Sequence, residues 1–356
     1  MSIYSILIPK IDEISLVPNP VVQNSEFKIS IMVSEIAVEL KPETRYSGEL
    51  YAGEVWWKMG VKTVKATING TDYSLEYNNS TGKWEKIITA PNITSFNLNG
   101  GYYPVTIVAT NEAGTSSSVS SDNSDACKLV VKERVKPTII LLSPSSGAYV
   151  SNAQQPISFN VIDENNGSGI NANSIVLKID GTAISNITKS TITNGYNCSY
   201  TPSTTLGDGI HTIEIDAQDN DGNIASTVSS SFTVDTIPPV LNITSPQNNI
   251  ITANGNVVVN GKTNDATSSP VVIDIKVNNV DAGSITVNSD GSFSKAIALT
   301  EGTNTALITA TDKAGKTTSV TLILVLDTSV PVISDVSIIP NPVDAGATMI
   351  VSVVVE

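Results

Sequence analysis

The feature that most constrains this chain is a seventeen-residue pattern that occurs three times without a gap. The copies run from Leu98 to Gly114, from Leu206 to Gly222 and from Leu299 to Gly315. Each copy places glycines near both ends of an apolar stretch, and a Ser/Thr-rich segment and an alternating apolar run follow it. Glycine-marked turns on both sides of an alternating run are typical of an antiparallel hairpin. The pattern therefore predicts the last hairpin of a sandwich domain, repeated along the chain.

The length of 356 residues fits about three domains of sandwich size. We predict an all-β chain of tandem immunoglobulin-like β-sandwich domains arranged as an extended rod. The predicted domains cover residues 1–135, 136–236 and 237–330. Short proline-bearing junctions such as Asp235–Pro239 favour stiff connections between them.

The last segment, 331–356, is predicted to be an incomplete fourth repeat. Its sequence from Ile333 matches the start of the chain with a constant offset of 322, so that Pro18–Val21 returns as Pro340–Val343. It would supply two strands, which cannot bury a core by themselves. Either the natural chain continues past Glu356, or the tail adds strands to another subunit.

Charge and composition exclude several classes of protein. The net charge is −14 with no basic region, which excludes nucleic-acid binding. The N-terminus has no signal-peptide pattern and no apolar run approaches a membrane span, so we expect a protein made in the cytoplasm and not inserted in a membrane. The two cysteines, Cys127 and Cys198, fall in different predicted domains and are expected to be free thiols.

The third predicted domain resembles bacterial Ig-like domains. The resemblance rests on motifs that follow in order: Asp235–Pro239, Ser245–Asn248, Val257–Thr263, Asp290–Ser294 and Glu301–Gly315. It extends well over the second domain and over the last third of the first. Such domains serve as spacers and adhesive modules, so the resemblance implies a fold more than a function.

The first domain also resembles Ig-like proteins of phage tails and phage-tail-like bacteriocins of Gram-positive bacteria. The residues that carry this likeness are Pro18–Val21 and Tyr46–Val55. The resemblance implies a virion or tail-like particle that assembles in the cytoplasm and leaves by lysis. That route accounts for the missing signal peptide.

An aromatic insertion at 41–60 interrupts the strand rhythm of the first domain. It holds the candidate docking residues Tyr46, Tyr51, Trp56 and Trp57. Adjacent tryptophans on a strand point to opposite faces, so at most one can enter the core of this domain. Docking to other particle subunits is favoured on the enrichment of aromatics at interfaces. A second internal core and stacking on a cell-surface glycan are the alternatives.

Candidates for chemistry are few. His211 is the single histidine, and Tyr103 and Asn304 occupy the same column of the repeated pattern. A column of Tyr, His and Asn predicts a side chain that bonds the backbone at a turn, as in a tyrosine corner, and no catalytic residue is predicted. No cofactor is predicted, and no nucleotide-binding or hydrolase motif is present.

Loop carboxylates leave one question open. Calcium binding is an alternative reading of five acidic residues of the second domain and its junction: Asp163, Glu164, Asp219, Asp221 and Asp235. Because Asp219 aligns with Asp312 and Asn111, capping of a turn is the favoured role at that position. A full ligand set is not visible in the sequence, so no metal site is predicted.

These observations predict a non-catalytic structural protein of a phage tail or phage-tail-like particle, acting as spacer or decoration. The expected partners are other particle subunits or further copies of the chain. The alternative is a cell-surface adhesin or S-layer-type stalk. A weaker third reading is an accessory region of a polysaccharide-degrading enzyme.

Overall fold

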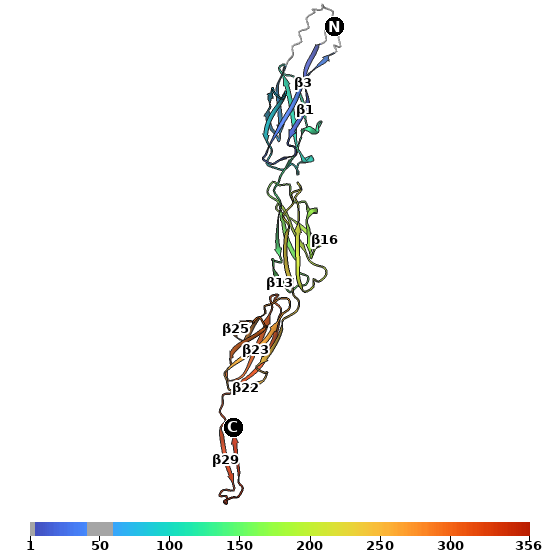
Figure 1. Ribbon diagram of the computed structural model, residues 1–356. Coiled ribbons are helices and arrows are strands. Elements are labelled where there is room, and N and C mark those ends of the chain that lie inside the picture. Colours follow the sequence, from blue (N-terminus) through green and yellow to red (C-terminus); the bar gives the residue numbers. More distant parts are fainter. Residues whose placement is uncertain (1–3, 41–59) are drawn as a thin grey trace, which may run out of the picture. The chain divides into compact units, whose positions relative to one another are not determined.

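The computed structural model describes residues 4–40 and 60–356 (Figure 1). Within these residues there is no α-helix, only three short 3-10 turns: η1 (Asn99–Gly101), η2 (Asp125–Cys127) and η3 (Ala172–Ser174). Among the described residues, no helix has the length and hydropathy needed to span a bilayer. The chain forms two compact units: residues 1–144, 156–200 and 212–230, and residues 145–155, 201–211 and 231–356.

Two antiparallel sheets and a short parallel pair make up the first group of strands. Its strands are β1 (Tyr4–Val17), β2 (Val21–Val22), β3 (Glu26–Leu40), β4 (Val61–Ile68), β5 (Thr71–Ser74), β6 (Glu76–Asn78), β7 (Lys83–Thr89), β8 (Tyr103–Asn111), β9 (Ser116–Val119), β10 (Lys128–Leu129) and β11 (Val131–Lys132). The sheet orders are β1-β3-β7-β6 and β10-β8-β4-β5, with β9 on β8 and with β11 parallel to β2. In Figure 1 the long strands β1 and β3 lie side by side.

The core of this group comes from the alternation of apolar residues. Along β8 every second residue is buried, from Tyr103 to Asn111. These side chains pack with Phe27, Ile29 and Ile31 of β3, each at most 1% exposed. A period of two is what a strand requires to present one apolar face.

The second group repeats this plan. Its strands are β12 (Thr138–Ser143), β13 (Ala148–Val150), β14 (Ile157–Ile162), β15 (Val176–Ile179), β16 (Thr182–Ile184), β17 (Thr188–Ile192), β18 (Gly195–Tyr200), β19 (Gly209–Asp216) and β20 (Val228–Val234). The sheet orders are β12-β14-β18-β17 and β13-β20-β19-β15-β16. The short strand β13 pairs parallel with β20.

The third group has strands β21 (Val240–Ser245), β22 (Ile250–Thr252), β23 (Asn256–Asn264), β24 (Val272–Val277), β25 (Val280–Thr286), β26 (Ser292–Ala298), β27 (Gly302–Thr311) and β28 (Thr317–Leu326). The orders are β21-β23-β26 and β22-β28-β27-β24-β25, again with β22 parallel to the last strand, β28. Its core includes Ile273, Ile275, Ile308 and Leu324, each fully buried. The predicted all-β fold of tandem immunoglobulin-like sandwiches is confirmed, whereas the domain boundaries and the rod stay predictions.

The repeated pattern forms the predicted hairpin most completely in its third copy, where β27 and β28 pair over their whole length. In the first copy, the return is divided between β9 and β10, which both pair with β8. The returning strand of this copy is therefore interrupted, unlike that of the third copy. The residues between β9 and β10 contain the η2 turn, which interrupts the pairing.

Sequence turn signals agree with the backbone. Asn69-Gly70 joins β4 to β5 and Asp180-Gly181 joins β15 to β16, with all four residues at positive φ. Positive φ at both central residues is the geometry of a type I′ hairpin, which favours Asn-Gly and Asp-Gly. Cys127 and Cys198 are buried free thiols, as predicted.

The tail reproduces the beginning of the chain residue by residue. β29 (Ile333–Ile339) and β30 (Ile350–Val355) pair antiparallel with Ile333 opposite Val355 and an irregularity before Asp335. With the offset of 322, this is the register of β1 and β3, including the irregularity between Ile11 and Glu13. The two strands expected of this segment are present, and its assignment as part of a fourth repeat stays a prediction. Its residues are largely exposed, whereas the equivalent positions of β3 lie in a core.

Candidate metal centres

Two groups of three buried carboxylates stand out among the described residues. The first carboxylate cluster is Glu133, Asp163 and Asp219, and the second is Asp235, Asp265 and Asp312. In each cluster one oxygen from every residue lies within 4.8 Å of the others. All six side chains are buried, with 8% exposure at most. The predicted docking residues, Tyr46, Tyr51, Trp56 and Trp57, lie outside the described residues.

Both clusters are built in the same way from three segments. One carboxylate, Glu133 or Asp235, stands in the linker just after the last strand of a sandwich, β11 or β20. The second follows β14 or β23 directly, and the third lies in the loop after β19 or directly after β27. Each cluster therefore joins a linker to two loops at one end of the following strand group.

The polar contacts of the first cluster come from its own loops. Asn223 Nδ2 donates hydrogen bonds of 2.7 Å to Asp219 Oδ2 and 3.0 Å to Glu133 Oε2. Ser168 Oγ donates to Glu133 Oε1 at 3.0 Å, and the Gly169 backbone N–H donates to Asp163 Oδ2 at 2.7 Å. These donors hold the carboxylates in place and are all uncharged.

The second cluster has an equivalent set of contacts. Ser268 Oγ donates to Asp235 Oδ2, as Ser168 does to Glu133 in the first cluster. The backbone N–H groups of Thr267 and Ser268 donate to Asp265 Oδ1 at 2.8 and 2.7 Å. The arrangement is that of a loop wrapped around a carboxylate.

Several oxygens in these clusters lack any partner. Asp163 Oδ1, Asp312 Oδ2 and both carboxylate oxygens of Glu164, which lies beside the first cluster, are buried and accept no hydrogen bond from the described residues. Asp163 is 4% exposed and Asp312 is 6% exposed. No Lys or Arg in the described ranges forms an ion pair with any of the six cluster residues. Buried carboxylates without such partners are costly.

The electrostatics reflect this crowding. Burial raises the pKa of the Glu133 carboxyl, and the neighbouring Asp219 carboxylate raises it further. Burial also raises the pKa of Asp312, with the charges of Asp235 and Asp265 adding to the effect. Like charges and desolvation both disfavour the ionised form. A bound cation would relieve both.

The structure combines two roles that the sequence presented as alternatives. Asn111, Asp219 and Asp312 each accept a hydrogen bond at Oδ1 from the backbone N–H four residues later, which confirms the predicted turn capping. In Asp219 and Asp312 the second oxygen is not used by this cap. One side chain can therefore cap the turn and also contribute to a cluster.

The five acidic residues singled out in the sequence separate into three environments. Asp163, Glu164 and Asp219 come together, whereas Asp235 belongs to the second cluster. Asp221 instead accepts hydrogen bonds from Thr94 Oγ1 at 2.7 Å and from the Glu133 backbone N–H at 3.1 Å. Sequence reasoning missed Glu133, Asp265 and Asp312 as cluster members. The sequence carried a signal for them, because Glu133 and Asp163 each have an Asp 102 positions later.

The column of the single histidine has the predicted structural role. His211 Nε2 lies 2.8 Å from the Gly207 carbonyl oxygen, and Asn304 Nδ2 donates to the Thr300 carbonyl at 2.7 Å. Tyr103 Oη donates to the Ile93 carbonyl at 3.1 Å. The prediction of a backbone-bonding column is confirmed at all three positions.

Comparisons with known proteins agree with the strand pattern. The family model described as bacterial Ig-like domain matches residues 158–236. The model described as glucodextranase, domain B, matches residues 239–328. A search of curated proteins found no match.

Solved structures resemble the chain at low sequence identity. The fibronectin(III)-like modules of Clostridium thermocellum CbhA share 16% identity over 53% of this chain and 94% of theirs, with a TM-score of 0.38. Latent PorU from Porphyromonas gingivalis shares 14% identity over 90% of this chain, with a TM-score of 0.25. Sidekick-1 immunoglobulin domains 1–5 share 15% identity over 92% of this chain, with a TM-score of 0.33. The chain spans 34% and 59% of the lengths of these last two. The match of residues 158–236, together with the strand arrangement, supports a tandem Ig-like fold.

Proposed function

We propose that the chain is a non-catalytic structural protein that acts as a spacer in a phage tail or phage-tail-like particle. The observation that carries this proposal is the way one strand group is fixed to the next through side chains. Asp221, in a loop of the second group, bonds Thr94 and the linker residue Glu133. Gln23 Nε2 of the first group donates to the Asn166 carbonyl at 2.9 Å.

Contacts of this kind suit a spacer, which has to keep neighbouring domains in a defined arrangement. A linker hydrogen-bonded on both sides restricts the relative motion that is otherwise expected of domains joined by short linkers. Ig-like architecture favours a structural or surface-binding role. The particle is favoured by the resemblance of Pro18–Val21 and Tyr46–Val55 to tail-gene proteins. In this proposal the aromatic insertion at 41–60 docks the chain to other subunits.

The exposed hairpin β29–β30 offers a second surface through which the chain could attach to other subunits. Ile338, Val351 and Val353 are 40%, 52% and 48% exposed, while the equivalent positions in the first group, Leu16, Ile29 and Ile31, are buried. We propose that this apolar face is covered by strands in the assembled particle, because edge strands and apolar sheet faces favour pairing.

A cell-surface adhesin or S-layer-type stalk is the second candidate. It is favoured by the match of residues 158–236 to the bacterial Ig-like domain, a module that also occurs as an adhesive unit. A role as accessory region of a polysaccharide-degrading enzyme follows only from the glucodextranase domain B match.

Immunogold electron microscopy distinguishes these candidates. An antibody against residues 137–330 is applied to intact cells and to particles purified after lysis. The proposal expects label on the particles, at a fixed position along them. Label confined to the surface of intact cells would support the stalk instead, and unlabelled particles would reject the proposed function.

A further inference from the structure

We propose that the first and second carboxylate clusters each bind one calcium ion, and that the ion fastens the linker before a strand group to the loops of that group. Neither the particle nor the stalk is needed for this inference. It follows from the residues of the two clusters alone.

The first argument is the unused coordination capacity of the buried oxygens. Asp163 and Asp312 are each more than nine-tenths buried and each has one oxygen without a partner in the described chain. Buried polar atoms are nearly always paired, so each exception requires an explanation. Both residues lie in a group whose oxygens are within 4.8 Å of one another, which is the spacing around a shared cation. Glu164 adds two further unpartnered oxygens beside the first cluster.

The second argument is that the arrangement occurs twice. Glu133 and Asp235 are equivalent, as are Asp163 and Asp265, with a separation of 102 positions in both cases. Asp219 and Asp312 occupy the same position in the repeated seventeen-residue pattern. The serine that donates to the linker carboxylate is also present in both clusters. If the acidic residues had gathered in these loops by chance, we would not expect the same three carboxylate positions and the same serine donor in both clusters.

The donor chemistry identifies the metal. Every candidate ligand is oxygen, and no His or Cys belongs to either cluster. Oxygen-only sites suit hard cations, whereas zinc and copper prefer nitrogen or sulfur. Calcium accepts six to eight oxygens in flexible geometry, including carboxylates and backbone carbonyls of loops. Magnesium demands near-octahedral geometry and retains several waters, which fits less well with three carboxylates already buried.

The consequence for the protein is mechanical. Glu133 and Asp235 belong to linkers, while their two partners belong to loops of the next strand group. An ion held by all three residues removes freedom from the linker. Calcium modules that act outside cells bind with dissociation constants of about 10⁻⁴ to 10⁻³ M. Calcium at such concentrations would then make the junctions stiffer.

Isothermal titration calorimetry of the full chain, stripped with a chelator and titrated with CaCl₂, tests the proposal. The expected result is two calcium ions per chain with half-saturation below about 1 mM. Asp163→Asn and Asp312→Asn should each bind one ion, and the double variant none. Asp274→Asn, at an exposed position of β24, makes the same chemical change elsewhere and should keep both.

Thermal unfolding provides a readout that a purely structural role would not give. In chelator, Asp163→Asn should unfold at the same or a higher temperature than the parent chain, because an amide removes a buried charge and can still accept from the Gly169 N–H. In calcium, the parent should gain more stability than this variant. If Asp163→Asn fails to fold, Asp219→Asn replaces it, since an amide oxygen retains the cap to Asn223.

Three results would overturn the proposal. The first is no calcium binding by the parent chain at millimolar CaCl₂. The second is two bound ions in Asp163→Asn or in Asp312→Asn. The third is magnesium binding at both sites with equal or higher affinity, which would reject calcium as the ligand.

Discussion

Asp163 and Glu164 are adjacent carboxylates that leave three buried oxygens without a hydrogen-bond partner. Burial raises the pKa of the Glu164 carboxyl, and the Asp163 side chain raises it further. Asp163 uses its other oxygen to accept from the Gly169 N–H at 2.7 Å. Without a cation, this pair disfavours folding at neutral pH, because ionising a desolvated Glu164 carboxyl beside Asp163 costs free energy.

We therefore expect Glu164→Gln to stabilise the chain in the presence of a chelator. The amide is neutral and brings two N–H donors to a place rich in acceptors, so the free energy of unfolding should rise by about 1 kcal/mol. Chemical denaturation at neutral pH measures this change. Glu112→Gln, whose side chain is 57% exposed, is the control and should change stability little. A loss of stability in Glu164→Gln would show that the carboxylate is favourably paired.

Asp221 connects two strand groups within the first unit. Its Oδ2 accepts from Thr94 Oγ1 at 2.7 Å and from the Glu133 N–H at 3.1 Å, and Thr94 is fully buried. Asp221→Ala should lower the free energy of unfolding by about 1–3 kcal/mol, because buried donors lose their acceptor. The measurement is made in chelator so that metal binding does not contribute. An equal effect from Asp122→Ala, at an exposed loop position, would contradict the assignment.

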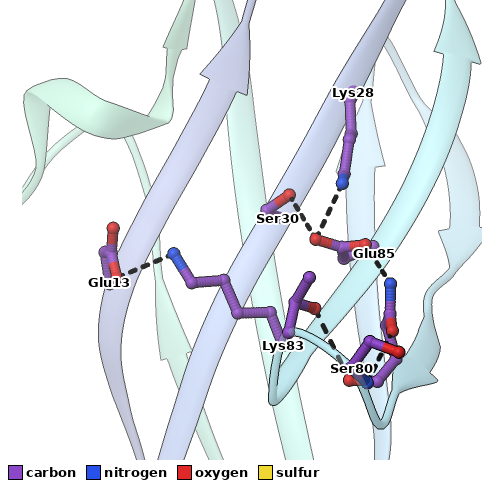
Figure 2. A network of polar contacts seen from close by, with 8 residues as sticks. Glu13, Lys28, Ser30, Ser80, Lys83 and Glu85 are labelled. Carbon is purple, nitrogen blue, oxygen red and sulfur yellow. Dashed lines mark hydrogen bonds and ion pairs between the residues drawn. The ribbon is translucent and has the colours of Figure 1, made fainter.

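A second polar network lies on the exposed face of β3, β6 and β7 (Figure 2). Lys28 Nζ lies 2.8 Å from Glu85 Oε1, Ser30 Oγ donates to the same oxygen at 3.2 Å, and Asn78 Nδ2 donates to Oε2 at 2.9 Å. These partners, with Lys28 foremost, lower the pKa of Glu85 from 4.5 to about 2. The Glu85 side chain is only 13% exposed, so the network is partly shielded from water.

The lowered pKa of Glu85 determines how its contribution to folding stability changes with pH. A carboxyl whose folded-state pKa is depressed contributes stability above its unfolded pKa and loses it as pH falls from about 4.5 through 2. Glu85→Gln should therefore unfold at a lower temperature than the parent at pH 7, and the difference should vanish towards pH 2. Glu76→Gln is the control, because its side chain is 86% exposed. A difference that persists unchanged at pH 2 would contradict this account.

The column of Tyr103, His211 and Asn304 allows a matched comparison between two strand groups. Asn304 is fully buried, donates to the Thr300 and Gly302 carbonyls at 2.7 and 3.0 Å, and accepts from the Thr300 N–H at 2.9 Å. Asn304→Ala should cost about 2–4 kcal/mol of unfolding free energy, because it leaves buried backbone groups unpaired.

The same column predicts almost no change in stability when His211 is replaced by Asn. His211→Asn should change the free energy of unfolding by less than about 0.5 kcal/mol, because Asn performs the same task at position 304. Thermal unfolding of both variants checks the pair of predictions. Comparable losses in His211→Asn and Asn304→Ala would contradict a shared turn-capping role.

Sequence patterns predicted the strands and turns well, because these elements are determined by residues that are close in the chain. Alternation predicted the buried faces of β8 and β27. The Asn69-Gly70 and Asp180-Gly181 pairs mark the turns between β4 and β5 and between β15 and β16. The repeat offset also predicted the β29–β30 hairpin, down to the register of its parent strands. A strand's period and a turn's φ angles are properties of neighbouring residues, so the sequence contains them directly.

The carboxylate clusters were recovered only in part, for a physical reason. Glu133, Asp163 and Asp219 lie far apart in the chain and meet only when a linker folds onto loops of the next strand group. The turn cap was a sufficient explanation for an acidic residue at position 219. A sequence pattern does not show whether the second oxygen of a capping carboxylate has another partner. Comparing the two repeats at the offset of 102 would have revealed the equivalent acids, although not their mutual distance.

In this tandem Ig-like chain, calcium at the two carboxylate clusters should make the junctions stiffer. Small-angle X-ray scattering of the full chain, recorded in chelator and in millimolar CaCl₂, tests it most directly. We predict a larger maximum dimension and a narrower distribution of sizes with calcium, and no such change in the Asp163→Asn/Asp312→Asn variant. Identical scattering curves of the parent chain under both conditions would contradict the claim.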